Sequence, residues 1–249
     1  MNCIGIIPAR YQSVRFPGKP LVPIYHKPMI QWVYERASEV LSQVWVATDN
    51  QEIYDVVNSF GGNAIMTSPD HQSGTDRCAE AARRIAKAVK FDVVVNIQGD
   101  EPFIEPEQIR ILTEAFEPGV EIATLVRKIK TLGELEDPNQ PKVVVGENGN
   151  ALYFSRAPIP YGRGIDRSDW LRKNTYWAHI GLYGYRSAVL QEITLLERGK
   201  LEMMESLEQL RWLENGYHIR VAESGCHTFG IDTPEDLERA LKLFPFKSV

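Results

Sequence analysis

The sequence predicts an α/β fold built on a doubly wound, mainly parallel sheet. In the first half of the chain, short runs rich in β-branched residues alternate with helix-length amphipathic stretches. The runs at 3–9, 44–48, 64–67 and 93–98 have the continuous apolar character of strands that are covered on both faces. Because crossovers between parallel strands are right-handed, the intervening helices should cover both faces of the sheet.

Four helices are expected in this half, around 28–41, 51–60, 75–90 and 106–116. Ligands of such sheets bind at the carboxyl ends of the strands. The loop after the first strand and the QGDEPF segment after the fourth should therefore lie at the ligand-binding edge.

The second half is less regular and predicts a smaller, β-rich lobe. Residues 142–156 have the pattern of a hairpin that turns at Asn148-Gly149, and 179–186 and 218–223 are expected to be strands. A helix is expected over 203–216, since apolar residues recur along one face of this stretch.

The last helix is predicted from its capping residues. Thr233 stands at the N-cap, Pro234 in the first turn and Asp236 at the capping-box position. Because Thr233 is the better cap, the side chain of Asp232 is left available for other contacts.

Positive charge is concentrated near the N-terminus. The 249-residue chain has a formal charge of −5, but residues 1–34 carry +4 and no acid, which leaves −9 for the remainder. An acidic remainder is poorly suited to the spread of phosphate contacts that nucleic acids require, so the patch indicates a small, multiply charged anion. No apolar run approaches the ~20 residues that span a bilayer, and the N-terminus lacks a signal-peptide pattern. We expect a cytoplasmic protein with neither nucleic-acid nor membrane partners.

Seven segments resemble the 3-deoxy-manno-octulosonate cytidylyltransferase (CMP-Kdo synthetase) family, in the family's order and over nearly the whole chain. They are IIPARYQSVRFPGKPL, TSPDHQSGTDR, NIQGDEPFI, ALYFSRAPIPY, HIGLYGYR, LEQLRWLENG and GIDTPEDLER. The resemblance implies a reaction of CTP with the acid sugar 3-deoxy-D-manno-octulosonate (Kdo) that gives CMP-Kdo and pyrophosphate for lipopolysaccharide synthesis. It also implies Mg²⁺ dependence, a homodimer and a fold of the nucleotide-diphospho-sugar transferase type.

The resemblance further suggests one nucleotidyltransferase domain over 1–249. In this interpretation 1–130 mainly binds the nucleotide. Residues 131–249 supply sugar binding, dimerisation and the closing helix.

The acid-free loop carries cations suited to a triphosphate. Guanidinium groups bind phosphate oxygens in pairs and lysine adds a mobile charge, so Arg10, Arg15 and Lys19 are predicted to hold the phosphates. The alternative is that these cations only keep a surface loop solvated. The position after the first strand favours phosphate binding.

Two aspartates are the predicted magnesium ligands. Mg²⁺ keeps several waters and needs only one or two protein carboxylates besides substrate phosphates. Asp100 ends a buried strand at the ligand edge, and Asp232 is freed from capping; the matching aspartates of the family are interpreted as metal ligands. Glu101 is a weaker third candidate. Arg10, Lys19, Asp100 and Asp232 form the predicted catalytic set.

The HQSGTDR segment is predicted to select the base, as the resemblance implies. Its serine-glycine turn can offer main-chain groups to cytosine, although a simple helix cap near Thr75 explains the same residues. The complete set predicted to bind CTP is Pro8, Ala9, Arg10, Arg15, Lys19, Gln72, Ser73, Gly74, Arg77 and Gln98.

The sugar requires a cation for its carboxylate and several hydroxyl partners. Arg156 is assigned to the carboxylate or neighbouring oxygens, and the hydroxyl shell is assigned to Gln98, His179, Tyr183, Tyr185, Glu208 and Gln209. Aromatic residues on a strand are more often core, and His179 is expected to be a hydrogen-bonding scaffold residue rather than a catalytic base.

Three alternatives remain open. A CTP sensor without turnover is disfavoured because both aspartates are present. A sialic-acid cytidylyltransferase fits less well, since the loop reads FPGKPL instead of ending in lysine-asparagine. Phe16 replaces the leucine that is common in the Kdo branch of the family. In this position the chain resembles the variant that takes 8-amino-Kdo.

Overall fold

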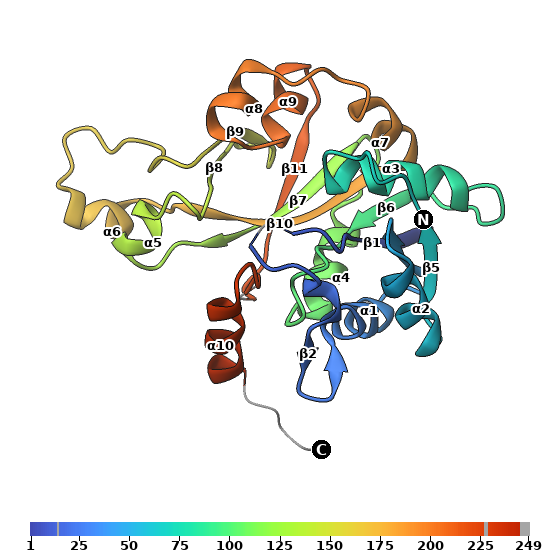
Figure 1. The fold of residues 1–249 in the computed structure, drawn as a ribbon. Coiled ribbons are helices and arrows are strands. Elements are labelled where there is room, and N and C mark those ends of the chain that lie inside the picture. The colour runs from blue at the N-terminus through green and yellow to red at the C-terminus, as the bar shows by residue number, and fades with distance from the viewer. Residues whose placement is uncertain (14, 227–228, 245–249) are drawn as a thin grey trace. The chain divides into compact units, whose positions relative to one another are not determined.

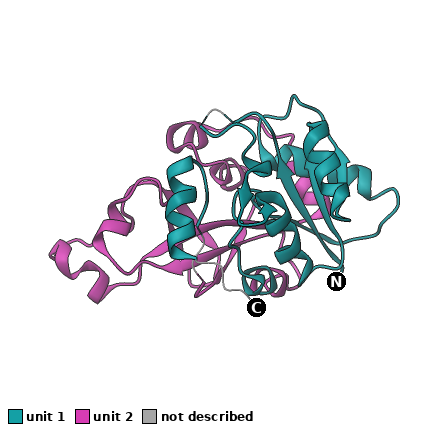
Figure 2. Cartoon of the chain, turned by 60° about the horizontal axis from the view of Figure 1, so that its bottom comes forward, with its two compact units in different colours: residues 1–110, 228–249 teal, residues 111–227 magenta. Residues whose placement is uncertain are grey.

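Strand β1 (Cys3–Ala9) organises the first of two units, which comprises residues 1–110 and 228–249 (Figure 2). Unit 2 comprises residues 111–227. The structure is a computed structural model that describes every residue except 14, 227, 228 and 245–249.

The sheet of unit 1 is parallel throughout. Its strands run in the order β6-β1-β4-β5, and every pair whose register is known is parallel. Strand β1 pairs with β4 (Val44–Thr48) and β6 (Val93–Asn96), and β5 (Asn63–Met66) pairs with β4. The four strands predicted from the apolar runs are therefore confirmed, with ends that differ by one or two residues.

The strand order creates a switch point beside β1. The chain moves outward from β1 to β4 and β5 and then returns past β1 to β6. Right-handed crossovers consequently put α1 on one face of the sheet and α3 on the other, as Figure 1 shows. At such a point the loops that leave β1 and β6 diverge and open a crevice for a ligand.

The helices confirm the predicted alternation. They are α1 (Met29–Ser38), α2 (Gln51–Ser59), α3 (Gly74–Ile85), α4 (Pro106–Glu114) and α10 (Pro234–Leu243). A short 3-10 helix, η1 (Lys19–Leu21), and a small hairpin of β2 (Pro23–Ile24) and β3 (Lys27–Pro28) were not expected from the sequence.

Burial of both faces explains the continuous apolar strands. Ile4, Ile6 and Ile7 of β1 are at most 1% exposed, although neighbouring side chains on a strand point to opposite faces. Burying each such side chain contributes roughly 1.5–3 kcal/mol. The central strand therefore fixes the position of the loop that follows it.

Unit 2 mixes strand directions. Its strands are β7 (Ile122–Lys128), β8 (Lys142–Val145), β9 (Ala151–Ser155), β10 (Trp177–Arg186) and β11 (Ile219–Glu223). Strand β10 is antiparallel to β7 and β8, and β11 is parallel to β7. The expected hairpin is confirmed, since β8 and β9 pair antiparallel and Gly149 adopts a φ of 77° in the turn.

The helix predicted over 203–216 is wrong as a single element. The structure has α8 (Lys200–Glu205) and α9 (Gln209–Glu214), separated by Ser206 in the left-handed region at φ 52°. The guanidinium of Arg156 donates to the carbonyls of Glu205 and Ser206, and these contacts hold the break open. The other helices of unit 2 are α5 (Leu132–Glu136), η2 (Arg167–Asp169), α6 (Trp170–Lys173) and α7 (Ser187–Ile193).

None of the helices in the described part of the chain combines the length and the apolar character needed to cross a lipid bilayer.

Candidate active site

A cavity of about 430 Å³ opens at the switch point of unit 1. This volume falls in the range of small-molecule sites, about 300–1,000 Å³. Every residue predicted to bind CTP or metal lines it: Pro8, Ala9, Arg10, Arg15, Lys19, Gln72, Ser73, Gly74, Arg77, Gln98, Asp100 and Asp232. The topology therefore gathers segments that are far apart in the sequence, and their contacts with CTP stay predictions.

Lys19 joins the two aspartates at this cavity. Its Nζ donates to Asp100 Oδ2 at 2.7 Å and to Asp232 Oδ1 at 3.2 Å. Arg15 Nη2 donates to the other oxygen of Asp232, Oδ2, at 3.0 Å. Two carboxylates thus share one ammonium group, and the second of them also carries a guanidinium partner.

Main-chain contacts bring the aspartates together. Thr233 and Asp236 form a complete capping box at the start of α10, as predicted, so the side chain of Asp232 takes no part in the cap. The N–H of Ile231 donates to the carbonyl of Asp100 at 2.9 Å and ties the two loops to each other. The loop after β6 and the entry to α10 are fixed side by side.

The carboxylate pair fits a hard divalent cation. Two carboxylates close enough to share one ammonium group can share one metal ion, with water and phosphate oxygens completing an octahedral shell. Within the described residues, no cluster of three or more His, Cys, Asp or Glu side chains could hold a metal ion by itself. A metal at this site would therefore depend on oxygens from the substrate.

Glu101 is less suited than Asp100 to the predicted role of metal ligand. Burial raises the pKa of Glu101 to about 8, and the nearby charge of Asp100 acts in the same direction. At neutral pH its carboxyl group therefore keeps a proton in the absence of a metal.

The SGT turn both caps α3 and lines the cavity. Ser73 forms a capping box with Asp76, and a Cβ placed on Gly74 would lie 3.2 Å from Cγ of Pro8. The helix cap is therefore confirmed, and the contact of this turn with cytosine stays a prediction. Exposed Gln72 donates through Nε2 to the carbonyl of Asp70 at 2.9 Å.

Arg77 makes its contacts inside the protein. It is 4% exposed, and its guanidinium contacts Asp49 Oδ2 at 2.8 Å and Thr67 Oγ1 at 2.6 Å. Neither partner could be predicted from the sequence, because both lie on other segments of the unit.

Gly99 and His71 also line the cavity, and sequence reasoning missed both. A Cβ on Gly99 would stand 2.9 Å from the backbone oxygen of Pro8. A glycine directly after a buried strand was the available signal, since close approach of two backbones excludes a side chain.

Gly99→Ala is expected to damage both stability and nucleotide binding. The new methyl group must push β1 and β6 apart at the cavity, at a cost of about 1–3 kcal/mol. Differential scanning fluorimetry should show a Tm about 3–10 °C lower, and the KM for CTP should rise. The matched control is Gly225→Ala, where a Cβ meets nothing within 4 Å. A Gly99→Ala protein with unchanged Tm and KM contradicts the close approach.

Three residues predicted to bind the sugar lie together in unit 2. The rings of His179 and Tyr183 are 5.2 Å apart, and Tyr183 stacks on Tyr185 at 5.9 Å. Both tyrosine rings contact Trp212 edge-on. Tyr183 and Tyr185 stack on each other from β10, and Tyr185 is fully buried in the core.

The other predicted sugar ligands of unit 2 lie around the break between α8 and α9. Arg156 Nε donates to the carbonyl of Glu205 at 2.6 Å and Nη1 to that of Pro138 at 2.9 Å. Glu208 stands at the N-cap of α9, and Gln209 is 5% exposed. The guanidinium of Arg156 therefore positions main chain in this structure, and its contact with a sugar carboxylate stays a prediction.

His179 is a neutral scaffold residue. Nε2 of His179 is hydrogen-bonded to the Thr124 hydroxyl at 3.0 Å, and the same hydroxyl lies 2.9 Å from the carbonyl oxygen of Leu182. Burial lowers the pKa of His179 to about 3. An imidazole that stays neutral to such low pH makes a poor proton carrier near pH 7.

His179 should make the fold sensitive to acid. The unfolded chain takes up a proton below about pH 6.5, whereas the native state does not until about pH 3, so stability is lost as the pH falls through this window. His179→Gln should therefore lose less Tm than the parent protein between about pH 7.5 and 5. Exposed His218 gives the control His218→Gln. An equal Tm loss in the parent and His179→Gln contradicts the buried neutral imidazole.

Comparisons with known proteins agree on one family. Residues 4–224 match the family model described as "Cytidylyltransferase". A 3-deoxy-manno-octulosonate cytidylyltransferase from Parabacteroides distasonis is 54% identical over 97% of both chains. One from Phocaeicola vulgatus is 55% identical over 96% of both chains.

Solved structures agree with the fold. A CMP:2-keto-3-deoxy-manno-octonic acid synthetase in complex with CTP is 44% identical, covers 98% of both chains and superposes with a TM-score of 0.90. A 4-diphosphocytidyl-2C-methyl-D-erythritol synthase from Anaerococcus prevotii covers 97% of both chains with a TM-score of 0.61 at 13% identity. The second likeness shows a shared fold alone.

Proposed function

Because the chain belongs to the 3-deoxy-manno-octulosonate cytidylyltransferase family, we propose that it transfers CMP from CTP to the anomeric hydroxyl of Kdo. The products are CMP-Kdo, for lipopolysaccharide synthesis, and pyrophosphate. The observation that carries the proposal is the pair Asp100 and Asp232, held by Lys19 in a cavity that Arg10 and Arg15 also line.

The cations are proposed to hold the triphosphate. CTP brings about four negative charges at neutral pH, and the attack on the α-phosphorus adds charge to its oxygens. Arg10, Arg15 and Lys19 lie at the cavity, where their charges can neutralise these oxygens. Lys19 would then exchange part of its contact with the aspartates for phosphate.

Asp100 and Asp232 are proposed to hold Mg²⁺ beside the phosphates. When bound, the ion would neutralise charge on the phosphate oxygens and lower the pKa of the attacking hydroxyl. The carboxylates orient the site, and Ile231 keeps their loops together through its bond to the Asp100 carbonyl. The Ser73-Gly74 turn is proposed to read cytosine.

The sugar-binding set is proposed as the sequence predicts it, with Arg156 for the carboxylate and Gln98, His179, Tyr183, Tyr185, Glu208 and Gln209 for the hydroxyl shell. We further propose one functional domain over 1–249, a homodimer and a cytoplasmic location. Light scattering on the purified protein tests the dimer.

One assay tests the function. The purified protein is incubated with CTP, Mg²⁺ and a panel of acid sugars, and pyrophosphate release is followed. Kdo should give the highest kcat/KM. No release with Kdo, 8-amino-Kdo or any other 3-deoxy-ulosonic acid refutes the proposal.

The same panel of sugars shows whether Kdo or 8-amino-Kdo is the preferred substrate. Phe16, the residue that resembles the 8-amino variant, packs against the buried cluster of Ile24, Met29, Ile231 and Ala240. Packing against this cluster explains an aromatic ring at position 16 without a role in substrate choice. We therefore expect Kdo to be preferred over 8-amino-Kdo.

A further inference from the structure

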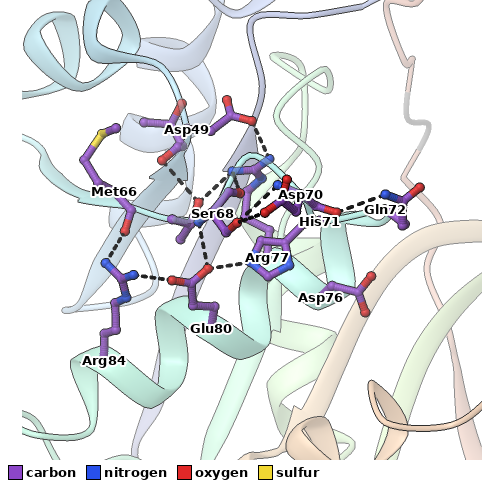
Figure 3. Close-up of polar contacts among 12 residues, drawn as sticks. Asp49, Met66, Ser68, Asp70, His71, Gln72, Asp76, Arg77, Glu80 and Arg84 are labelled. Atoms are coloured by element: carbon purple, nitrogen blue, oxygen red, sulfur yellow. Dashed lines mark hydrogen bonds and ion pairs between the residues drawn. The ribbon is translucent and has the colours of Figure 1, made fainter.

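Helix α3 grips the segment that precedes it through three side chains. Arg77, Glu80 and Arg84 are three or four residues apart, so they project along one side of the helix. Figure 3 shows these side chains converging on the segment 66–71. We call the three residues the α3 clamp.

Glu80 is the centre of the clamp. Its Oε2 accepts from the N–H of Ser68 at 2.8 Å and from Nε2 of His71 at 2.5 Å, while Oε1 pairs with Arg84. Since an ionised carboxylate only accepts, Nε2 of His71 carries the proton. Glu80 is 7% exposed, and its Oε2 is directed at this one segment.

Arg77 and Arg84 hold the same segment from either side of Glu80. Arg77 binds Thr67 Oγ1 at 2.6 Å and the carbonyl of Ser68 at 3.3 Å, and Arg84 Nη1 donates to the carbonyl of Met66 at 2.8 Å. The clamp therefore fixes three consecutive residues and, through His71, the start of the turn that lines the cavity.

The charge state of Glu80 supports a permanent clamp. Burial acts to raise the pKa of Glu80, but the hydrogen bonds from Ser68 and His71 and the charge of Arg84 together hold it below its usual value. The carboxylate therefore remains ionised throughout the neutral range.

We propose that Glu80 is a positioning residue for nucleotide selection, which holds His71 and the 68–73 segment so that Gln72, Ser73 and Gly74 meet the base in one geometry. Glu80 does not line the cavity itself, whereas His71 and residues 72–74 do. Its effect on the base must therefore pass through the segment it holds. This inference rests on the proposed function, because it assumes that residues 72–74 face cytosine.

The test compares Glu80→Gln with a matched control. Glutamine keeps the shape and one acceptor but loses the charge that holds Arg84 and His71. We expect the KM for CTP to rise roughly tenfold, the KM for Kdo to stay within about twofold, and the preference for CTP over UTP to fall several-fold.

Glu134 gives the control. It holds the loop before α5 in the same way, accepting from the N–H of Lys130 at 2.9 Å and pairing with Arg127 at 2.6 Å, but it lies in unit 2 and outside the cavity. Glu134→Gln should lower Tm without changing either KM. A merely structural role for Glu80 predicts the same pattern for both variants.

Each outcome decides the inference. An unchanged KM for CTP in folded Glu80→Gln, or an equal rise in both KM values, overturns it. If Glu80→Gln does not fold, Arg84→Met loosens the same carboxylate from a side chain that is 48% exposed, and a rise in the KM for CTP alone of about threefold is then expected. A folded Arg84→Met with parental kinetics also overturns the inference.

Inactivity of the parent protein with CTP and Kdo instead refutes the proposed function.

Discussion

Asp100→Asn is expected to lower kcat by at least about 10²-fold while leaving the fold intact. The carboxylate lies at a loop edge, and its side chain is 32% exposed, so its loss removes little packing. Asparagine keeps the shape but removes half of the negative charge that the two aspartates offer to a cation. The Mg²⁺ concentration needed for half-maximal rate should rise in parallel.

Steady-state kinetics over a Mg²⁺ titration checks this result. Asp55→Asn is the control, since Asp55 is exposed on α2 and accepts a hydrogen bond from Gln51 of its own helix. Near-parental turnover and Mg²⁺ dependence in Asp100→Asn would remove this residue from the metal site.

Lys19→Ala is expected to reduce kcat/KM for CTP by roughly 10²–10³-fold. The variant loses a cation proposed to bind the triphosphate, and it leaves Asp100 and Asp232 without the ammonium group that they share. The KM for Kdo should change far less, because the predicted sugar ligands apart from Gln98 lie in unit 2.

Lys27→Ala is the control for this variant. Lys27 belongs to the same positive stretch, but its Nζ pairs with Glu35 at 2.7 Å on α1, and it does not line the cavity. If Lys19→Ala and Lys27→Ala lose equal activity, the general charge of the N-terminal stretch, and not the position of Lys19, governs binding of CTP.

The parallel sheet could be predicted because each of its strands can be recognised from its own residues. A strand buried on both faces must be apolar at every position, so β1, β4 and β6 stand out in the sequence. The topology then brings Asp100 to the same edge as Lys19 without any knowledge of side-chain contacts. Most of the cavity lining follows from this edge alone.

The break between α8 and α9 could not be predicted from local pattern. Apolar residues continue through 203–213 at helical spacing, but Ser206 adopts the left-handed region because Arg156, about fifty residues earlier, binds the carbonyls there. A distant guanidinium overrides local propensity in this case.

Strand β7 was not predicted, although its apolar run has the same pattern as that of β4.

The role of Arg77 shows the same limit. A cation in a loop-and-helix segment near the binding edge suggested a contact with substrate, but Asp49 and Thr67 already bind its guanidinium. Arg77 lines the cavity, but its guanidinium is paired with residues of other segments, and its contact with CTP stays a prediction. Spacing along one helix cannot reveal such partners.

A crystal structure with CTP and Mn²⁺ in place of Mg²⁺ tests the central claim most directly, because manganese is located by its anomalous scattering. We predict a manganese peak about 2.1 Å from carboxylate oxygens of both Asp100 and Asp232, with the phosphates against Arg10, Arg15 and Lys19. A peak that contacts neither aspartate, or a triphosphate turned away from Lys19, would contradict the account.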